Sequence, residues 1–337
     1  MRKPITTGQR DRETELITKI AQTIPSIGHM GDRETLIAGI GDDAAVLRPS
    51  ARSEWVISCD FSLENVHFQA NYPPDSVGYK SLARATSDLA AMGAQPRYFL
   101  LALALPGAKT GKWLHRFASG MSRAAREFDS RLIGGDISRS TSVAICITVL
   151  GETPAGRAVP RSGARPGDLI YVSGTLGAAQ LGLELVLRGR SRQPSLKKYL
   201  QPHFYPKIPA ALGQALARHR IPSAMMDISD GLSTDLTRLC TVSSVGAQIW
   251  AEKLPAVHVP AALLARGIDP LALALHGGDD YGLLFTVPPK SAQHLRRLTH
   301  RAQITHIGEI TRTRKIALIH RDGRASPLAA KGWNPFR

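Results

Sequence analysis

Cysteine is scarce in this chain of 337 residues, which contains only three. Cys59, Cys146 and Cys240 lie far apart in the sequence, and none belongs to a CxxC pair. A disulfide framework or a zinc site needs more cysteines at closer spacing. The sequence therefore predicts neither kind of site, and we expect the three cysteines to be reduced core residues.

Long hydrophobic runs are also lacking. A membrane-spanning helix needs about 18 to 20 consecutive apolar residues, and no stretch of this sequence approaches that length. The first residues are not followed by the apolar core of a signal peptide. The sequence thus predicts a cytoplasmic protein that does not bind a membrane.

Aromatic residues make up only 6% of the chain, and acidic residues are outnumbered. The chain contains 43 Lys and Arg against 27 Asp and Glu, a formal net charge of +16. Clustered basic residues are typical of proteins that bind nucleic acid, but here they are scattered and have little of the aromatic interleaving that stacks on bases. A basic solvated surface is the favoured interpretation. A nucleic-acid-binding protein with structural acids remains the alternative from another class.

The acids that are present gather beside glycines. In residues 39–47, Asp42 and Asp43 are adjacent, and every other residue is Gly, Ala, Ile, Val or Leu. Two carboxylates a few ångströms apart repel each other unless a proton, a base or a metal ion compensates them. Taken alone, the doublet is consistent with a cation site or with turn formation, so the other acids must decide between the two.

Further acids end predicted strands, follow them, or lie on the small apolar face of a predicted helix. A charge on an apolar face is unfavourable without a partner, and strand ends are where α/β folds display functional groups. These acids are Asp60 at the end of a buried strand at residues 55–60, Asp88 on a helix at 79–93, Asp136 after a strand at 131–133 and two glycines, and Asp227 and Asp230 at the end of a short strand. Oxygen ligands without a cysteine or histidine cluster are typical of Mg²⁺. The pattern therefore predicts phosphoryl transfer from a metal-bound nucleotide.

Predicted strands and helices alternate along the chain, as they do in α/β folds. They include strands at residues 98–105, 142–150 and 169–173 and a helix at residues 112–128. Residues 151–168 are rich in Gly, Pro and Arg, which is typical of a domain junction. We expect one domain at residues 1–152 and a second α/β domain at 153–337. Residues 189–209 are predicted to form a long polar loop.

Several motifs carry a resemblance to a known family. In chain order they are GIGDDAAVL (39–47), HF (67–68), SDLAAMGA (87–94), GGD (134–136), RSGARPGD (161–168), SDGL (229–232), GGDDYGLLFTVP (277–288) and GW (332–333). Together they resemble the thiamine-monophosphate kinase family, which belongs to the aminoimidazole-ribonucleotide-synthetase superfamily. The resemblance implies an α/β (α+β type) fold with a two-domain PurM-like architecture. It also implies a homodimer in which the mixed sheets of the N-terminal, ATP/Mg-binding and dimerisation domains pair across the interface.

The implied reaction is the transfer of a phosphoryl group from ATP to thiamine phosphate, with several Mg²⁺ ions and ATP as co-substrate. The attacking phosphate oxygen is already anionic, so positioning and charge neutralisation are needed rather than a general base. The implied metal ligands are Asp43, Ser58, Cys59 through its backbone carbonyl, Asp60, Asp88, Asp136, Asp227 and Asp230; the implied ATP contacts are Gly135, Asp136, Arg161 and Ser229; the implied substrate contacts are His67, Asp279 and Trp333. Asp42 is implied to support Asp43.

Four positions depart from the pattern of the family. Cys59 and Ile137 each replace a usual threonine, while Asp279 and Gly282 each replace a usual glutamate. These departures leave the metal ligands in place but bear on substrate affinity and identity. They favour, as the closest alternative, a sister enzyme of the superfamily that uses ATP on another small molecule. Selenophosphate synthesis is disfavoured because no cysteine lies in a glycine-rich N-terminal segment.

Overall fold

The computed structural model of the chain describes residues 12–24, 36–38, 45–191, 193–298, 302–334 and 336. The chain divides into two compact units that interleave along the sequence. Unit 1 comprises Met1–Ser50, Cys59–Leu82 and Arg97–Val149, and unit 2 comprises Ala51–Ser58, Ala83–Pro96 and Leu150–Arg337. Two segments that precede residue 152 thus belong to unit 2, and the expected division into residues 1–152 and 153–337 stays a prediction.

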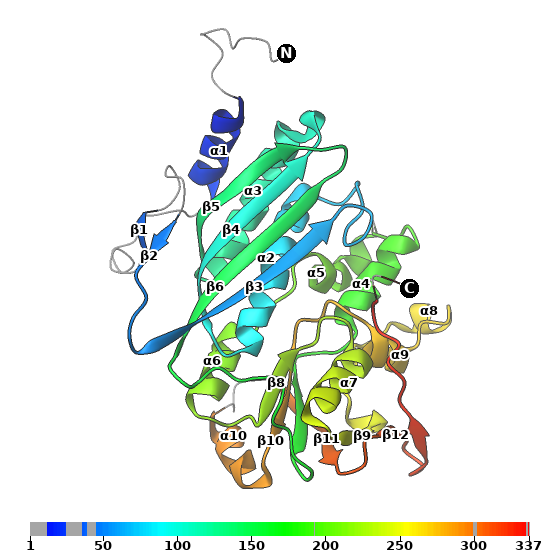
Figure 1. The fold of residues 1–337 in the computed structure, drawn as a ribbon. Helices are drawn as coiled ribbons and strands as arrows, with labels where there is room; N and C mark the ends of the chain where they lie inside the picture. Colours follow the sequence, from blue (N-terminus) through cyan, green and yellow to red (C-terminus); the bar gives the residue numbers. More distant parts are fainter. Residues whose placement is uncertain are drawn as a thin grey trace. The chain divides into compact units, whose positions relative to one another are not determined.

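A four-stranded sheet has the strand order β3-β6-β4-β5 (Figure 1). Its strands are β3 (Ser53–Leu63), β4 (Gln95–Leu105), β5 (Arg131–Arg139) and β6 (Ala144–Pro154). Strands β4 and β5 run parallel, with an irregular register between Phe99 and Leu100. Buried and less buried positions alternate along β6, because successive side chains point to opposite faces of a sheet. A separate pair of short strands is formed by β1 (Leu36–Ala38) and β2 (Val46–Leu47).

The helices that precede or follow these strands are α1 (Arg12–Thr23), α2 (Pro74–Ala91), η1 (Gly107–Lys109) and α3 (Lys112–Glu127). The predicted helix at residues 112–128 is confirmed as α3, and its side chains Phe117, Met121 and Ala124 are buried at the predicted helical spacing. Helix α2 ends two residues before Gly93, whose positive φ of 73° is typical of a helix C-terminus.

The prediction of a buried strand at residues 55–60 is wrong in two respects. Strand β3 extends to Leu63, and one of its faces is open, with Ile57 63% and Phe61 56% exposed. Cys59 is exposed as well, and its Sγ lies 3.2 Å from Sγ of Cys146 on the adjacent strand β6. The expectation of separate cysteines in the core is therefore wrong for this pair, although all three cysteines carry free thiols.

A seven-stranded mixed sheet lies at the centre of unit 2, with the order β13-β12-β9-β11-β7-β10-β8. Its strands are β7 (Leu169–Ser173), β8 (Ala224–Asp227), β9 (Gly246–Trp250), β10 (Leu283–Val287), β11 (Ile304–Thr311), β12 (Ile316–Ile319) and β13 (Ala325–Pro327). The described pairs are antiparallel except β9 with β12. Strand β8 is at one edge, so its last residue, Asp227, lies at the edge of the sheet.

The helices of unit 2 cover both faces of this sheet. They are α4 (Ala178–Leu187), η2 (Pro194–Leu196), α5 (Lys197–Phe204), α6 (Ala210–Arg218), α7 (Leu232–Ser243), η3 (Ala251–Lys253), α8 (Ala261–Leu264), α9 (Pro270–His276), η4 (Pro289–Ser291) and α10 (Ala292–Leu298). Alternate strand residues enter different cores: Met226 packs in the cluster that contains Leu236 of α7, and Met225 in the cluster that contains Leu216 of α6. Nearly complete burial of β8 and β10 follows from this arrangement.

The predicted loop at residues 189–209 is wrong, because α5 lies within it. This helix is short and contains Pro202, but Leu200 and His203 are buried. Packing of α5 against α4 stabilises a helix that propensity alone disfavours. In the described part of the chain, no helix is long and apolar enough to cross a membrane.

Candidate active site

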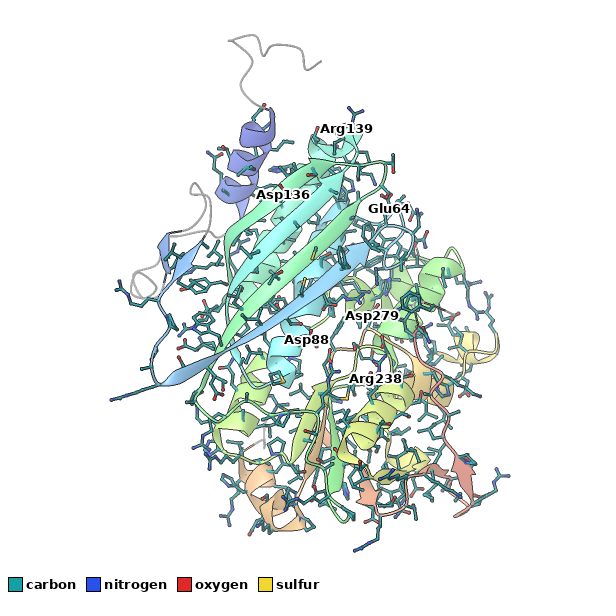
Figure 2. All side chains as sticks on the ribbon, in the orientation of Figure 1. Glu64, Asp88, Asp136, Arg139, Arg238 and Asp279 are labelled. Atoms are coloured by element: carbon teal, nitrogen blue, oxygen red, sulfur yellow. The ribbon has the colours of Figure 1, made fainter. Side chains whose placement is uncertain are left out.

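Two carboxylates of unit 2, Asp88 and Asp227, form the first part of the candidate site. Asp227 is only 2% exposed and accepts a hydrogen bond from Ser87 Oγ at 2.8 Å. Ser58 Oγ donates to Asp88 Oδ2. Helix α2 therefore presents Ser87 to Asp227 and carries Asp88, which is labelled in Figure 2. Strand β3 supplies the hydroxyl that orients Asp88.

The negative charges of Asp88 and Asp227 repel each other, and the positive charge of Arg161 offsets this only in part. Burial, and then the negative charge of Asp88, raise the pKa of Asp227 to about 7, against the lowering effects of the Ser87 hydrogen bond and of Arg161. Asp227 consequently binds a proton more readily than an ordinary aspartate, and a bound cation would compete with that proton. Arg161, a predicted ATP contact, is exposed, yet its charge acts on this acid. Ser58, Asp88, Asp227 and Arg161 thus interact within unit 2, while their roles as metal ligands and ATP contact stay predictions.

The turn after β8 joins residues from three parts of unit 2. The carbonyl of Ser229 accepts from the amide of Asp279 at 2.8 Å, and the carbonyl of Asp230 accepts from the amide of Trp333 at 2.9 Å. Ser229, a predicted ATP contact, is thereby fixed beside Asp279, and Asp230, a predicted metal ligand, is fixed beside Trp333. Asp279 and Trp333 are both predicted substrate contacts. Trp333 is 45% exposed.

The side chain of Asp230 already has a cationic partner. Arg238 Nη1 lies 2.5 Å from Asp230 Oδ2 and 3.0 Å from Asp235 Oδ1. Burial raises the pKa of Asp235 to about 6, and the charge of Asp230 adds to this effect, whereas Arg238 and two backbone amides oppose it. The sequence interpretation missed Asp235 and Arg238. An acid in the first turn of a helix that follows Ser-Asp-Gly is the signal that points to Asp235.

Neighbouring acids of the glycine-rich turn at 277–281 have different surroundings. Asp279, the predicted substrate contact, has a positive φ of 66° and accepts from the hydroxyl of Tyr281 at 2.7 Å. Asp280 instead accepts from the amides of Gly177 and Ala179 at the start of α4, at 2.5 and 3.0 Å. Asp280 therefore stabilises a helix terminus, while the role of Asp279 as a substrate contact stays a prediction.

Two predicted metal ligands of unit 1 lie within strands rather than at strand ends. Asp60 is inside β3 and Asp136 is inside β5, so both predicted positions at strand ends are wrong. These strands are the two edges of the sheet, with β6 and β4 between them. Neighbouring strands are spaced by about 4.8 Å, so the two acids are at least about 14 Å apart. One ion cannot bind both, and the assignment requires separate ions.

The close approach of two strands explains Gly135, a predicted ATP contact. Its φ is +154°, and a Cβ atom there would lie 1.9 Å from the carbonyl oxygen of Leu101 on β4. Next to it, Asp136 is exposed and accepts from Ser138 Oγ at 3.1 Å. The glycine is thus needed for strand pairing, independently of any phosphate.

His67, a predicted substrate contact of unit 1, has a defined ring orientation. Its Nδ1 accepts from the amide of Leu63 at 3.0 Å, so in the neutral ring Nε2 carries the hydrogen. Nearby in the sequence, Glu64 pairs with Lys109 at 2.8 Å and accepts from the amide of Val143 at 2.7 Å. Burial raises the pKa of Glu64, but these partners outweigh burial and lower it below its usual value. The carboxylate anchors the segment that carries His67.

The last part of the predicted metal site is the pair of adjacent acids in residues 39–47. Asp42 and Asp43 belong to residues 39–44, which lie outside the described residues. Across the residues that are described, no group of three or more His, Cys, Asp or Glu side chains is arranged to hold a metal ion. The assignments of all predicted metal ligands, Cys59 included, therefore stay predictions.

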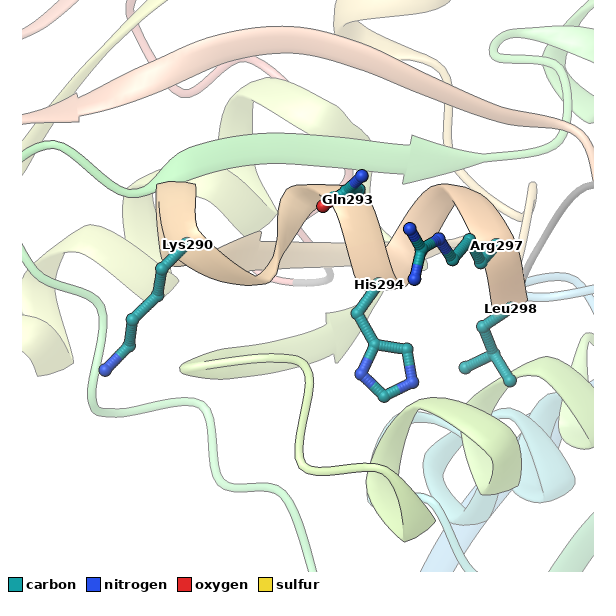
Figure 3. A pocket seen from close by; sticks show the side chains of 5 residues that line it. All are labelled: Lys290, Gln293, His294, Arg297 and Leu298. Carbon is teal, nitrogen blue, oxygen red and sulfur yellow. The ribbon is translucent and has the colours of Figure 1, made fainter.

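A pocket of 450 Å³ lies on α10, away from every predicted site residue in the sequence. Its lining residues are Lys290, Gln293, His294, Arg297 and Leu298 (Figure 3). No Phe, Tyr or Trp belongs to this lining set, so it offers no stacking surface for bases. Exposed basic groups of this kind attract anions only within about 8 Å at physiological salt. The pocket is better explained as part of a basic solvated surface.

Comparisons with known proteins assign most of the chain to described families. Residues 41–153 match the family described as AIR synthase related protein, N-terminal domain, and residues 165–321 match AIR synthase related protein, C-terminal domain. The thiamine-monophosphate kinase of Synechococcus elongatus is 38% identical over 280 residues, which cover 80% of this chain and 83% of that protein.

Solved structures show the same likeness. The crystal structure of thiamine-monophosphate kinase from Stenotrophomonas maltophilia has a TM-score of 0.80 and 34% identity, covering 92% of this chain and 96% of that chain. A structure described as "AaThiL complexed with AMPPCP and TMP" has a TM-score of 0.75 and 32% identity, covering 85% and 88%. These matches confirm the predicted fold class, an α/β (α+β type) PurM-like architecture with two mixed sheets.

Proposed function

The chain belongs to the thiamine-monophosphate kinase family of AIR synthase related proteins, and we propose that it transfers the terminal phosphoryl group of ATP directly to thiamine monophosphate. The products are thiamine diphosphate and ADP. The observation that carries the proposal is the pair Asp88 and Asp227: Asp227 is buried, and the charge of Asp88 acts on it, so a cation would stabilise the pair. Binding of AMPPCP and TMP by the related protein supports the same pair of substrates.

The donor set of this site fits Mg²⁺. Asp88, Asp227 and the hydroxyl of Ser58 offer only oxygen atoms, and burial together with the charge of Asp88 raises the pKa of Asp227 to about 7. We propose these residues as ligands in unit 2, and Asp60 and Asp136 as ligands in unit 1. When bound, Mg²⁺ supplies neutralisation of the phosphate charges.

The remaining residues of the chain position the substrates. Ser87 and Ser58 hold the two carboxylates in fixed orientations, so that little reorganisation accompanies the reaction. Arg161 offers a guanidinium for a nucleotide phosphate. Asp279 and Trp333, joined to the turn after β8, are proposed to contact thiamine phosphate together with His67. No general base is required, because a phosphate oxygen is already a nucleophile.

An assay of products tests the function. Purified protein with thiamine phosphate, ATP and Mg²⁺ is expected to form thiamine diphosphate and ADP in equal amounts, measured by chromatography. Omission of Mg²⁺ or addition of EDTA is expected to lower the rate at least about a hundredfold, because metal ions offset the repulsion between two polyanions. ADP formation without thiamine diphosphate would contradict the proposal.

A sister enzyme with another acceptor remains the second candidate. Two departures support it: Asp279 is one methylene shorter than the usual glutamate, and Gly282 has no side chain. At Gly282 a Cβ atom would lie 2.5 Å from the carbonyl oxygen of Ser173, so the fold leaves no room for the usual glutamate. A panel of other phosphorylated metabolites in the same assay separates the two candidates by the acceptor with the highest kcat/KM.

We further propose a homodimer formed through the four-stranded sheet, and a cytoplasmic location for the enzyme. The open face of β3 exposes Ile57 and Phe61, by 63% and 56%. Large apolar side chains at neighbouring positions of one sheet face are typical of a protein interface. The other possible partner, a nucleic acid, would not be recognised by such an apolar surface.

Substitution of Phe61 by glutamate tests this interface. The wild type is expected to sediment as a dimer, and Phe61→Glu as a monomer at micromolar concentration, because the new charge would be desolvated at the interface. Leu187→Glu is the matched control, since Leu187 is 63% exposed but belongs to α4 of unit 2. A monomeric wild type, or dissociation by both variants, would count against the proposed interface.

A further inference from the structure

Asp235 occupies an unusual position at the start of α7. Its side chain is fully buried, and Oδ2 accepts hydrogen bonds from three successive backbone amides, those of Ser229, Asp230 and Gly231, at 3.1, 3.1 and 3.0 Å. Three amides directed at one oxygen form a concave anion site of the kind that elsewhere binds phosphate. Here the chain fills that site with its own carboxylate.

These bonds differ from those of an ordinary helix cap. The N-cap residue of α7 is Gly231, with φ 111° and ψ 145°, and it has no side chain to accept from the first amides of the helix. Asp235 accepts instead from the amides of Gly231 and of the two residues before it, so it fixes the turn that leads into α7. The turn at 229–231 therefore cannot use its amides to bind a nucleotide phosphate.

The carbonyl groups of the turn are occupied as well. Those of Ile228, Ser229 and Asp230 accept from the amides of Tyr281, Asp279 and Trp333, at 2.9, 2.8 and 2.9 Å. With both kinds of backbone group engaged, the parts of the turn that remain for a ligand are the side chains of Ser229 and Asp230. Their orientation is set by the backbone that Asp235 holds.

Arg238 extends this control to the side chain of Asp230. The same Nη1 atom contacts Asp235 Oδ1 at 3.0 Å and Asp230 Oδ2 at 2.5 Å. The carboxylate of Asp235 is thus bonded to the turn directly through Oδ2 and linked to the Asp230 carboxylate through Arg238. The three side chains form one connected unit.

We propose that Asp235 is a positioning residue for nucleotide binding: it holds the backbone of residues 229–231, and through Arg238 the carboxylate of Asp230, in the orientation that receives metal-bound ATP. This inference rests on the proposed function. The competing interpretation is that Asp235 only stabilises α7, as any helix cap does. The two interpretations make different predictions. If Asp235 is a positioning residue, loss of its carboxylate weakens ligand binding more than another substitution in α7 that lowers stability by the same amount.

Asp235→Asn tests the role of the carboxylate. Asparagine keeps the shape but presents one oxygen and a donor amide, so it cannot accept from the three amides and Arg238 together. In the ligand-free protein, we expect hydrogen exchange at the amides of residues 229–231 to become at least about tenfold faster. We also expect the Kd for Mg·AMPPCP, measured by calorimetry, and the KM for ATP to rise at least about tenfold, with a smaller change in kcat.

Leu239→Ala is the matched control. Leu239 is fully buried on the same helix, so its truncation lowers the melting temperature without touching the turn. It is expected to leave the Kd for Mg·AMPPCP within about twofold of the wild type. An equal rise of Kd in Leu239→Ala and Asp235→Asn, or unchanged exchange at 229–231 in Asp235→Asn, would overturn the positioning role.

If Asp235→Asn does not fold, Arg238→Met tests the link between Asp235 and Asp230. Arg238 is partly exposed and its loss keeps the bonds from Asp235 to the amides, so we expect unchanged exchange at 229–231 and a Kd for Mg·AMPPCP raised at least about threefold. An unchanged Kd would overturn the link to Asp230. Absence of Mg·AMPPCP binding by the wild type would overturn the proposed function and this role together, and the exchange measurement would still show whether Asp235 holds the turn.

Discussion

Asp227→Asn is expected to lower kcat/KM for thiamine diphosphate formation at least about a thousandfold, which corresponds to about 4 kcal/mol of transition-state stabilisation. Asparagine preserves the volume and can still accept from Ser87, so the fold should persist. What is lost is the negative charge beside Asp88 that binds a cation. Steady-state kinetics over a range of Mg²⁺ concentrations measure the effect, and excess Mg²⁺ should restore little of the rate.

Asp168→Asn is the matched control for this prediction. Asp168 is 4% exposed, close to the 2% of Asp227, and accepts from the amide of Arg165 at 2.9 Å and from Ser223 Oγ at 2.6 Å. It therefore shares the burial, and the partners described for its carboxylate are a backbone amide and a hydroxyl rather than a second acid. We expect it to change stability while kcat/KM stays within about tenfold of the wild type. Activity of Asp227→Asn in that same range would contradict the metal-ligand assignment, and would agree with a protein whose acids are structural.

Local patterns allowed the part of the site near β8 to be predicted. A short apolar strand that ends in an acid and continues as Ser-Asp-Gly predicts a strand, a turn and a helix, and β8 and α7 follow that order. Asp227 is at the end of β8 because pairing with β10 stops there, at Leu283. The information that defines this end is contained in consecutive residues.

The same reasoning failed for Asp60 and Asp136 because strand length is decided by partners that are distant in sequence. Gly134 and Gly135 usually mark the end of a strand, but β4 lies alongside and pairs with β5 through both glycines and beyond. The missing Cβ of Gly135 allows this approach. For β3, exposed apolar residues were taken as evidence of burial, although one face of the sheet is open within the single chain.

The roles of Asp235 and Arg238 could not be predicted from spacing alone. A helix with Asp in its first turn is common, and such an acid usually interacts with the helix dipole at the surface. Its burial and its three amide bonds depend on the backbone of the turn, which is in turn fixed by segments around residues 280 and 333. Likewise, the contact between Cys59 and Cys146 exists only because β3 and β6 are neighbours in the sheet.

Asp43→Asn is expected to lower kcat/KM at least about a hundredfold, and Asp42→Asn less than about tenfold. The two acids are adjacent, so a change at either removes one charge from the same place in the sequence. A purely electrostatic contribution would therefore give similar losses for both, because Coulomb energy varies slowly over a few ångströms. A direct metal ligand is different, since its bond to the ion is lost outright.

The comparison is sharpest when the Mg²⁺ dependence of both variants is measured alongside their melting temperatures. Asp43→Asn should require several times more Mg²⁺ for half-maximal rate, whereas Asp42→Asn should resemble the wild type. Asn at position 42 also retains the ability to form a turn, so the local backbone is preserved in that control. Equal losses, or a larger loss in Asp42→Asn, would reverse the assignment and make Asp42 the ligand. A normal Mg²⁺ requirement in both variants would favour the other interpretation of Asp42 and Asp43, a turn between two glycines and an apolar run.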